Sequence, residues 1–199
     1  RRPGKHGRNS GVLPMRLLLT VLLSLSAGAC TGAGMSEKPL AAEEMPVVFT
    51  PQEVADGQPK YQRAYDDRTG ADYRQAITAG RRAVAMVTYQ SVPGDYVFSG
   101  TALRESLGNM FSDEAEIAWG DSGSTTRGAV ETDWQAFELA VDDVRMGCMG
   151  LRRELRHHAE VGNVPNTAQA IAVAYLCRQG PAMTADDAVR VAAVLRERT

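Results

Sequence analysis

The sequence predicts an α+β domain, in which an antiparallel sheet of about five strands is packed by two or three helices and crosslinked by one disulfide. Three observations favour this class. Several segments after residue 71 alternate apolar and polar residues, others place apolar residues three and four positions apart, and two cysteines lie in the C-terminal half. The 199-residue chain is 44% hydrophobic and 23% charged, which is typical of a globular protein rather than a disordered one.

Three segments have the period of helices packed on a sheet: residues 71–80, 103–111 and 184–198. In the first, Tyr73, Ala76 and Ile77 share one helical face. Ser99 or Thr101 is expected to cap the second helix. Thr184 is expected to cap the third, because Asp186 and Asp187 follow it and suit the positive end of the helix dipole. The buried stripe of this last helix is Ala188, Val191, Ala192 and Leu195, and Arg196 and Arg198 suit its end.

Strands are predicted where apolar residues form a short continuous run or alternate with polar residues. These segments are 83–89, 96–98, 115–119, 137–141, 144–148 and 171–177. Turn residues over 92–95 and 142–143 separate some of them. The Gly- and Ser-rich residues 120–124 lie between two strand-like stretches and predict a hairpin loop.

The first 29 residues have the pattern of a secretory signal segment. They hold five basic residues and no acidic one, which leaves 17 basic against 24 acidic residues, a net charge of −7, in the rest of the chain. An apolar core over 17–26 and three small residues follow the basic start. The chain has no run of about 18 or more apolar residues, so we expect no membrane-spanning helix. Residues 1–14 precede Met15 and are interpreted as an upstream extension.

Cys30 directly follows the small residues. The sequence Ser26-Ala-Gly-Ala-Cys30 resembles the lipobox of bacterial lipoproteins, with Ala27 at the position where Leu is usual. The resemblance covers only residues 15–30. It implies cleavage before Cys30, acylation of its sulfur by palmitate-type chains, and anchoring in the bacterial cell envelope. The residue after Cys30 is Thr31 rather than Asp, which favours the outer membrane, facing the periplasm.

The chain is therefore expected to have three parts. Residues 1–29 form the signal segment, residues 30–70 form a lipid-anchored flexible tether with a weakly patterned lead-in, and residues 71–199 form a single globular α+β domain.

Cys148 and Cys177 are the two cysteines left after the predicted anchor. An exported protein meets an oxidising compartment, where an even pair indicates a disulfide. Cys148 shares a strand face with Val144 and Met146, and Cys177 shares one with Tyr175, so both sulfurs are expected to point into the core. Their spacing is too long for the C-x-x-C pattern of a redox pair, and a structural disulfide is predicted.

Ser122 is a candidate nucleophile. The motif Gly120-Asp-Ser-Gly-Ser124 resembles part of the nucleophile motif of trypsin-like serine proteases. That family places its catalytic His and Asp before the Ser, whereas the only histidine before Ser122 is His6 in the signal segment. No catalytic residue is assigned. The alternative is a small envelope hydrolase that uses Ser122 with His157 or His158.

Basic residues gather in one segment, which we interpret as a possible binding patch for lipid headgroups, an anionic envelope polymer or another envelope protein. Its members are Arg152, Arg153, Arg156, His157 and His158. Adjacent histidines point in different directions and lack the spacing of metal ligands, so we predict no metal and no cofactor. The formal net charge of −2 argues against a broad basic face for nucleic acid. The sequence thus predicts a membrane-anchored envelope lipoprotein with a non-enzymatic binding or structural role.

Overall fold

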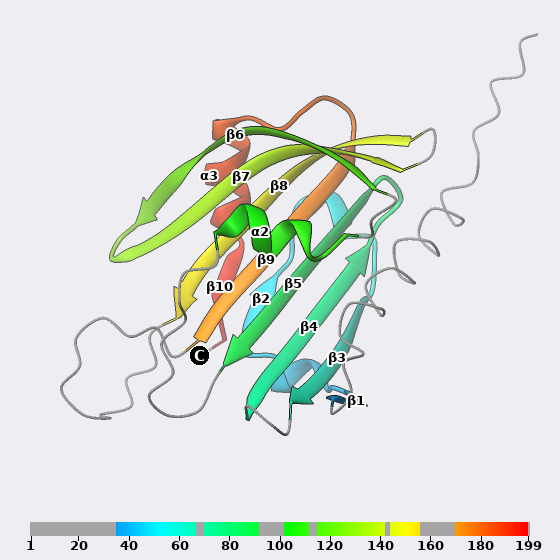
Figure 1. Cartoon of the computed structure of the whole chain (residues 1–199), viewed down its shortest axis with the longest axis vertical. Helices are drawn as coiled ribbons and strands as arrows, with labels where there is room; N and C mark the ends of the chain where they lie inside the picture. Colours follow the sequence, from blue (N-terminus) through cyan, green and yellow to red (C-terminus); the bar gives the residue numbers. More distant parts are fainter. Residues whose placement is uncertain are drawn as a thin grey trace, which may run out of the picture.

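A computed structural model describes residues 35–66, 70–91, 102–111, 115–141, 144–155 and 170–198. Eight antiparallel strands form one sheet in the order β1-β3-β4-β5-β9-β8-β7-β6 (Figure 1). A second sheet pairs β2 with β10. The chain builds one half of the large sheet as far as β5, crosses to the opposite edge at β6 and returns strand by strand until β9 pairs with β5.

The strands of the large sheet are β1 (Met35–Pro39), β3 (Pro59–Asp66), β4 (Ala71–Ala79), β5 (Ala83–Ser91), β6 (Glu116–Arg127), β7 (Val130–Val141), β8 (Val144–Leu155) and β9 (Ala170–Gln179). The small sheet consists of β2 (Val47–Phe49) and β10 (Leu195–Glu197). The helices are α2 (Leu103–Gly108) and α3 (Ala185–Ala192), with the 3-10 turns η1 (Ala42–Glu44) and η2 (Gln52–Val54).

The predicted α+β class with about five strands is wrong. The protein is mostly antiparallel β, and its described residues include only two short α-helices. Alternation is a weak signal in such a sheet, because the central strands are covered on both faces and therefore carry apolar residues at successive positions. In β9, for example, every residue from Ala170 to Cys177 is buried.

Residues 71–80 were expected to be a helix, and the structure shows the strand β4 instead. Ala76 packs against the core on one face of the sheet and Ile77 lies in the core on the other face. The helical spacing of the apolar residues was therefore coincidental. Asp72 and Arg74 interrupt the period of two, because they form ion pairs on the sheet rather than pointing to solvent.

The predicted hairpin loop at 120–124 is also wrong, since these residues lie inside β6. A β-bulge between Trp119 and Ser122 shifts the register with β7. The hairpin turn comes later, at Gly128, whose φ of 64° lies in the left-handed region that glycine adopts without strain. The exposed edge strand is polar, so its composition resembles that of a loop.

Other predicted elements are confirmed. Strands cover 83–89, 137–141, 144–148 and 171–177, and β6 covers all but the first residue of the predicted strand 115–119. Leu103–Gly108 is helical. Thr184 caps α3 through a capping box, in which its hydroxyl accepts from the Asp187 amide and the Asp187 carboxylate accepts from the Thr184 amide. That helix ends at Ala192, and Leu195 and Arg196 belong to β10. The predicted cap residues Ser99 and Thr101, the strand 96–98 and the turns at 92–95 and 142–143 lie outside the described residues.

The large sheet separates two hydrophobic cores. On one face, α3, β2 and β10 cover β5, β9 and β8, and Met45, Phe49 and Leu151 are among the buried residues. On the other face α2 crosses the middle of the sheet, where Leu107 packs with Phe137 and Tyr175 (Figure 1). Burial of apolar area on both faces is the main driving force of this fold.

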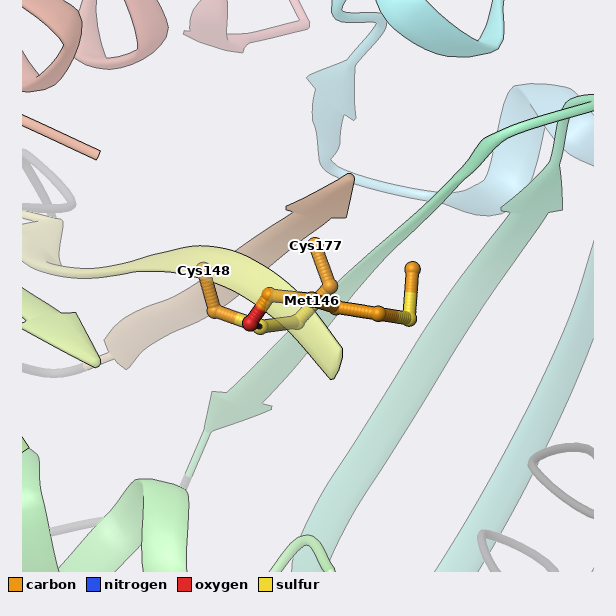
Figure 2. Close-up of a disulfide and its surroundings, with 3 residues drawn as sticks. All are labelled: Met146, Cys148 and Cys177. Atoms are coloured by element: carbon orange, nitrogen blue, oxygen red, sulfur yellow. Dashed lines mark hydrogen bonds between the residues drawn. A yellow bond between two sulfur atoms is a disulfide. The ribbon is translucent and has the colours of Figure 1, made fainter. Parts of the chain in front are cut away.

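The predicted disulfide between Cys148 and Cys177 is confirmed. The two residues lie directly opposite each other on β8 and β9, and both are fully buried (Figure 2). The carbonyl oxygen of Met146 lies 3.8 Å from the sulfur of Cys148. Because both sulfurs belong to the core beneath α2, the bond crosslinks the neighbouring strands β8 and β9 inside the protein and does not face solvent.

Candidate functional site

Among the described residues, an apolar groove between β2, η2, β3 and β4 is a candidate ligand site. It has a volume of about 380 Å³, within the range of small-molecule sites. Most of its lining is apolar and comes from Val47, Val48, Phe49, Pro51, Val54, Ala55, Pro59 and Ala76. We call this cavity the β2 groove.

Few polar groups line the β2 groove. Thr50 and Thr78 carry hydroxyl groups, Tyr61 carries a phenol, and Arg198 carries the only charged side chain of the lining. The backbone amide of Arg198 donates a 2.7 Å hydrogen bond to the carbonyl of Pro46, which places this residue beside the start of β2. An apolar cavity with one cation suits a ligand that has an apolar chain and an anionic end.

The walls of the groove are fixed by backbone pairing and by an ion network. β2 pairs with β10 over three residues, from Val47–Glu197 to Phe49–Leu195. Glu53 of η2 lies 2.7 Å from Arg190 of α3 and 3.8 Å from Arg178 of β9. Asp187 of α3 also contacts both arginines, at 2.9 Å from Arg190 and 3.3 Å from Arg178. η2 is therefore tied to both the helix and the sheet.

Asp72 forms a second network on the same face of β4 as the groove residue Ala76. Its carboxylate accepts hydrogen bonds from Arg63 at 2.8 Å and from Arg74 at 2.7 Å, and Arg74 also donates to the carbonyl of Glu44 in η1. Burial acts to raise the pKa of Asp72, but the hydrogen bonds and charges of the two arginines outweigh it and hold that pKa below its usual value. The carboxylate thus stays charged and holds Arg74, whose guanidinium links η1 to the sheet.

The structure describes two members of the predicted basic patch and places them on opposite faces of β8, as expected for neighbours in a strand. Arg152 lies 3.2 Å from Glu154 and 3.7 Å from Asp133. Arg153 instead contacts Thr132 and the end of α3. Their guanidinium groups are therefore not brought together. Arg156, His157 and His158 lie outside the described residues.

Ser122 is exposed on β6 and lies opposite Gln135 in the register with β7. Gln135 donates hydrogen bonds to the backbone carbonyls of Gly120 and Asp121, which supports the bulged part of β6. The histidines proposed as partners of Ser122 lie outside the described residues, so the hydrolase alternative stays a prediction. The predicted lipidation site Cys30 also lies outside them.

The β2 groove was not anticipated from the sequence. Its only signal there was the short apolar segment at Val47–Phe49 within an otherwise weakly patterned region. The region assigned to the tether and lead-in in fact contains β1, β2 and β3.

Within the described part of the chain, no helix is long and apolar enough to cross a membrane. The same residues contain no group of three or more His, Cys, Asp or Glu side chains arranged to hold a metal ion. No protein-family model, curated protein or solved structure matches this chain.

Proposed function

We propose that this protein is a lipid-anchored component of the bacterial envelope that binds an amphipathic ligand in the β2 groove. The ligand would have an apolar chain and an anionic end, such as a fatty acid. The observation that carries the binding role is the groove itself, an apolar cavity of about 380 Å³ with Arg198 as its one charged lining residue.

The envelope location rests on the sequence of residues 15–30 and its resemblance to a lipobox. The buried disulfide is consistent with it, because such bonds persist in oxidising compartments such as the periplasm. Two or three acyl chains on Cys30 would hold the protein stably, since a single chain binds membranes only marginally. The outer membrane, facing the periplasm, is the proposed site.

The anchor is tested by the intact mass of the protein purified from bacterial membranes. We expect a chain that begins at Cys30 and carries acyl chains, and a gain of two hydrogen atoms when the disulfide is reduced. A Cys30→Ser variant is the matched control and should be neither acylated nor retained in the membrane fraction. A wild-type protein without acyl chains would contradict the anchor and leave the groove to be tested separately.

The groove is tested by titration with an environment-sensitive fluorescent fatty acid. Ala76→Phe places a ring in the half-buried wall of the groove, and we expect at least tenfold weaker binding. The matched control is Ala118→Phe on the exposed surface of β6, which should bind like the wild type. Circular dichroism would establish that both variants fold.

Arg198→Gln removes the charge of the groove and leaves its apolar lining unchanged. Arg198 is exposed. Its replacement should weaken binding of the fatty acid but not of the corresponding alcohol, which lacks the carboxylate. If Ala76→Phe and Arg198→Gln bind the fatty acid as strongly as the control Ala118→Phe, the groove is not the ligand site.

A further inference from the structure

Three arginines meet where the C-terminal end of α3 packs on the large sheet. Arg127 ends β6, Arg153 lies in β8 and Arg196 lies in β10. Together with Val130, Leu195 and the last residues of the helix they line a cavity of about 380 Å³, which we call the arginine hollow. None of its residues lines the β2 groove, so the two are separate sites.

Arg153 is the fixed member of the three. Its Nε donates to the hydroxyl of Thr132 at 2.9 Å, and its Nη2 donates to the carbonyl of Ala192 at 3.1 Å. Its Nη1 donates to the carbonyl of Leu195. The bond to Ala192 satisfies a carbonyl that the end of α3 leaves without a helical partner. The half-buried guanidinium therefore has a defined position in the wall of the hollow.

The positive charge of the hollow lacks a carboxylate partner. Over the described ranges, Arg63, Arg74, Arg152, Arg178 and Arg190 each lie within 4 Å of a carboxylate, whereas Arg127, Arg153 and Arg196 form no such ion pair. Burial lowers the pKa of Arg153, the charge of Arg127 acts in the same direction and that of Glu197 opposes it. The group nevertheless remains charged at physiological pH.

Hydrogen bonding to the C-terminal end of α3 accounts for the position of Arg153, but not for the positions of Arg127 and Arg196. Arg127 makes one long hydrogen bond, of 3.4 Å, to the carbonyl of Ala193. Arg196 is exposed and lies on the small sheet. Four acidic residues, Glu131, Asp133, Glu154 and Glu197, line a separate cavity together with Arg152. Three like charges around one cavity repel one another unless an anion lies between them.

We propose that the arginine hollow binds a phosphate group. Guanidinium groups from three separate strands can donate to several oxygens of a tetrahedral anion at once, which suits phosphate better than a planar carboxylate. The phosphate group has two possible sources, the phosphodiester of a lipid headgroup and free inorganic phosphate. The proposal does not depend on the β2 groove or on acylation of Cys30.

Calorimetric titration of the purified full chain tests the proposal. One arm uses inorganic phosphate, and the other uses glycerophosphoglycerol, a water-soluble phosphodiester with the chemistry of a lipid headgroup. We expect saturable binding in at least one arm, and at least tenfold weaker binding by the Arg127→Gln/Arg196→Gln variant. Both residues are exposed, so their replacement should leave the fold intact.

The matched control is Arg82→Gln/Arg145→Gln, which removes the same two charges from exposed positions outside the hollow. It should bind like the wild type. Tighter binding of the diester would identify a lipid headgroup as the source, and tighter binding of inorganic phosphate would identify the free ion. Absence of saturable binding in both arms, or an equal loss in the control variant, would overturn the proposal.

Discussion

Replacing both Cys148 and Cys177 with alanine is expected to lower the free energy of unfolding by about 3–4 kcal/mol. The two cysteines are 29 residues apart in the sequence and directly opposite each other on β8 and β9. Breaking the bond releases a long loop in the unfolded chain, which gains conformational entropy. Urea unfolding at neutral pH, followed by circular dichroism, measures the difference from the oxidised wild type.

The reduced wild type separates the crosslink from side-chain packing. It keeps both sulfur atoms in the core but lacks the bond, so it should resemble the double variant in stability. Both sulfurs are fully buried, and the native oxidised protein should therefore resist mild reductant until it unfolds. A double variant within about 1 kcal/mol of the oxidised protein would show that the crosslink contributes little.

The disulfide and the strands around it could be predicted because their residues follow simple rules. In β7 and β8 the residues that point beneath α2, such as Phe137, Leu139 and Met146, alternate with others along each strand. The same alternation placed both sulfurs in the core. β5 was identified by a different signal, its almost continuous apolar sequence between Ala83 and Tyr89.

β3 and β4 could not be identified in this way, and only the start of β6, within the predicted strand 115–119, was recognised. That is why the fold class was wrong. β3 buries only Ala64, and Arg63 pairs with Asp72 of β4 on the surface of the sheet. β6 is an edge strand with a mostly exposed surface, so nothing selects for apolar residues at every second position. Ion pairs within a sheet and polar edge strands look like loops in a sequence.

Neither candidate site could be predicted from the sequence, because each is assembled from distant segments. Ala76 and Arg198 both line the β2 groove, and only the positions of β2 and β10 across the sheet bring them together. Arg152 and Arg153 look like a single patch in the sequence, yet the alternation of β8 separates them. Arg153 meets Arg127 only because β6 and β8 flank β7 in the sheet.

Leu107→Ala in α2 is expected to lower the free energy of unfolding by about 2–4 kcal/mol. Leu107 is fully buried and lies above Gly150 of β8. A Cβ atom added to Gly150 would collide with Cδ1 of Leu107 and lie 2.8 Å from its Cδ2. The side chain of Leu107 thus occupies space that is free only because residue 150 has no side chain. Gly150→Ala should cost about 1–3 kcal/mol, because the leucine must move.

The double variant Leu107→Ala/Gly150→Ala tests whether the two residues share that space. We expect it to lose clearly less stability than the sum of the single variants, because the new methyl group partly fills the cavity left by the leucine. Gly108→Ala is the matched control, since a Cβ atom at this neighbouring position of α2 meets nothing within 4 Å. It should be neutral or stabilise by up to about 1 kcal/mol, as helical glycines do when replaced by alanine. Strictly additive costs would mean that Leu107 does not lie over Gly150, and that α2 does not close this face of the sheet.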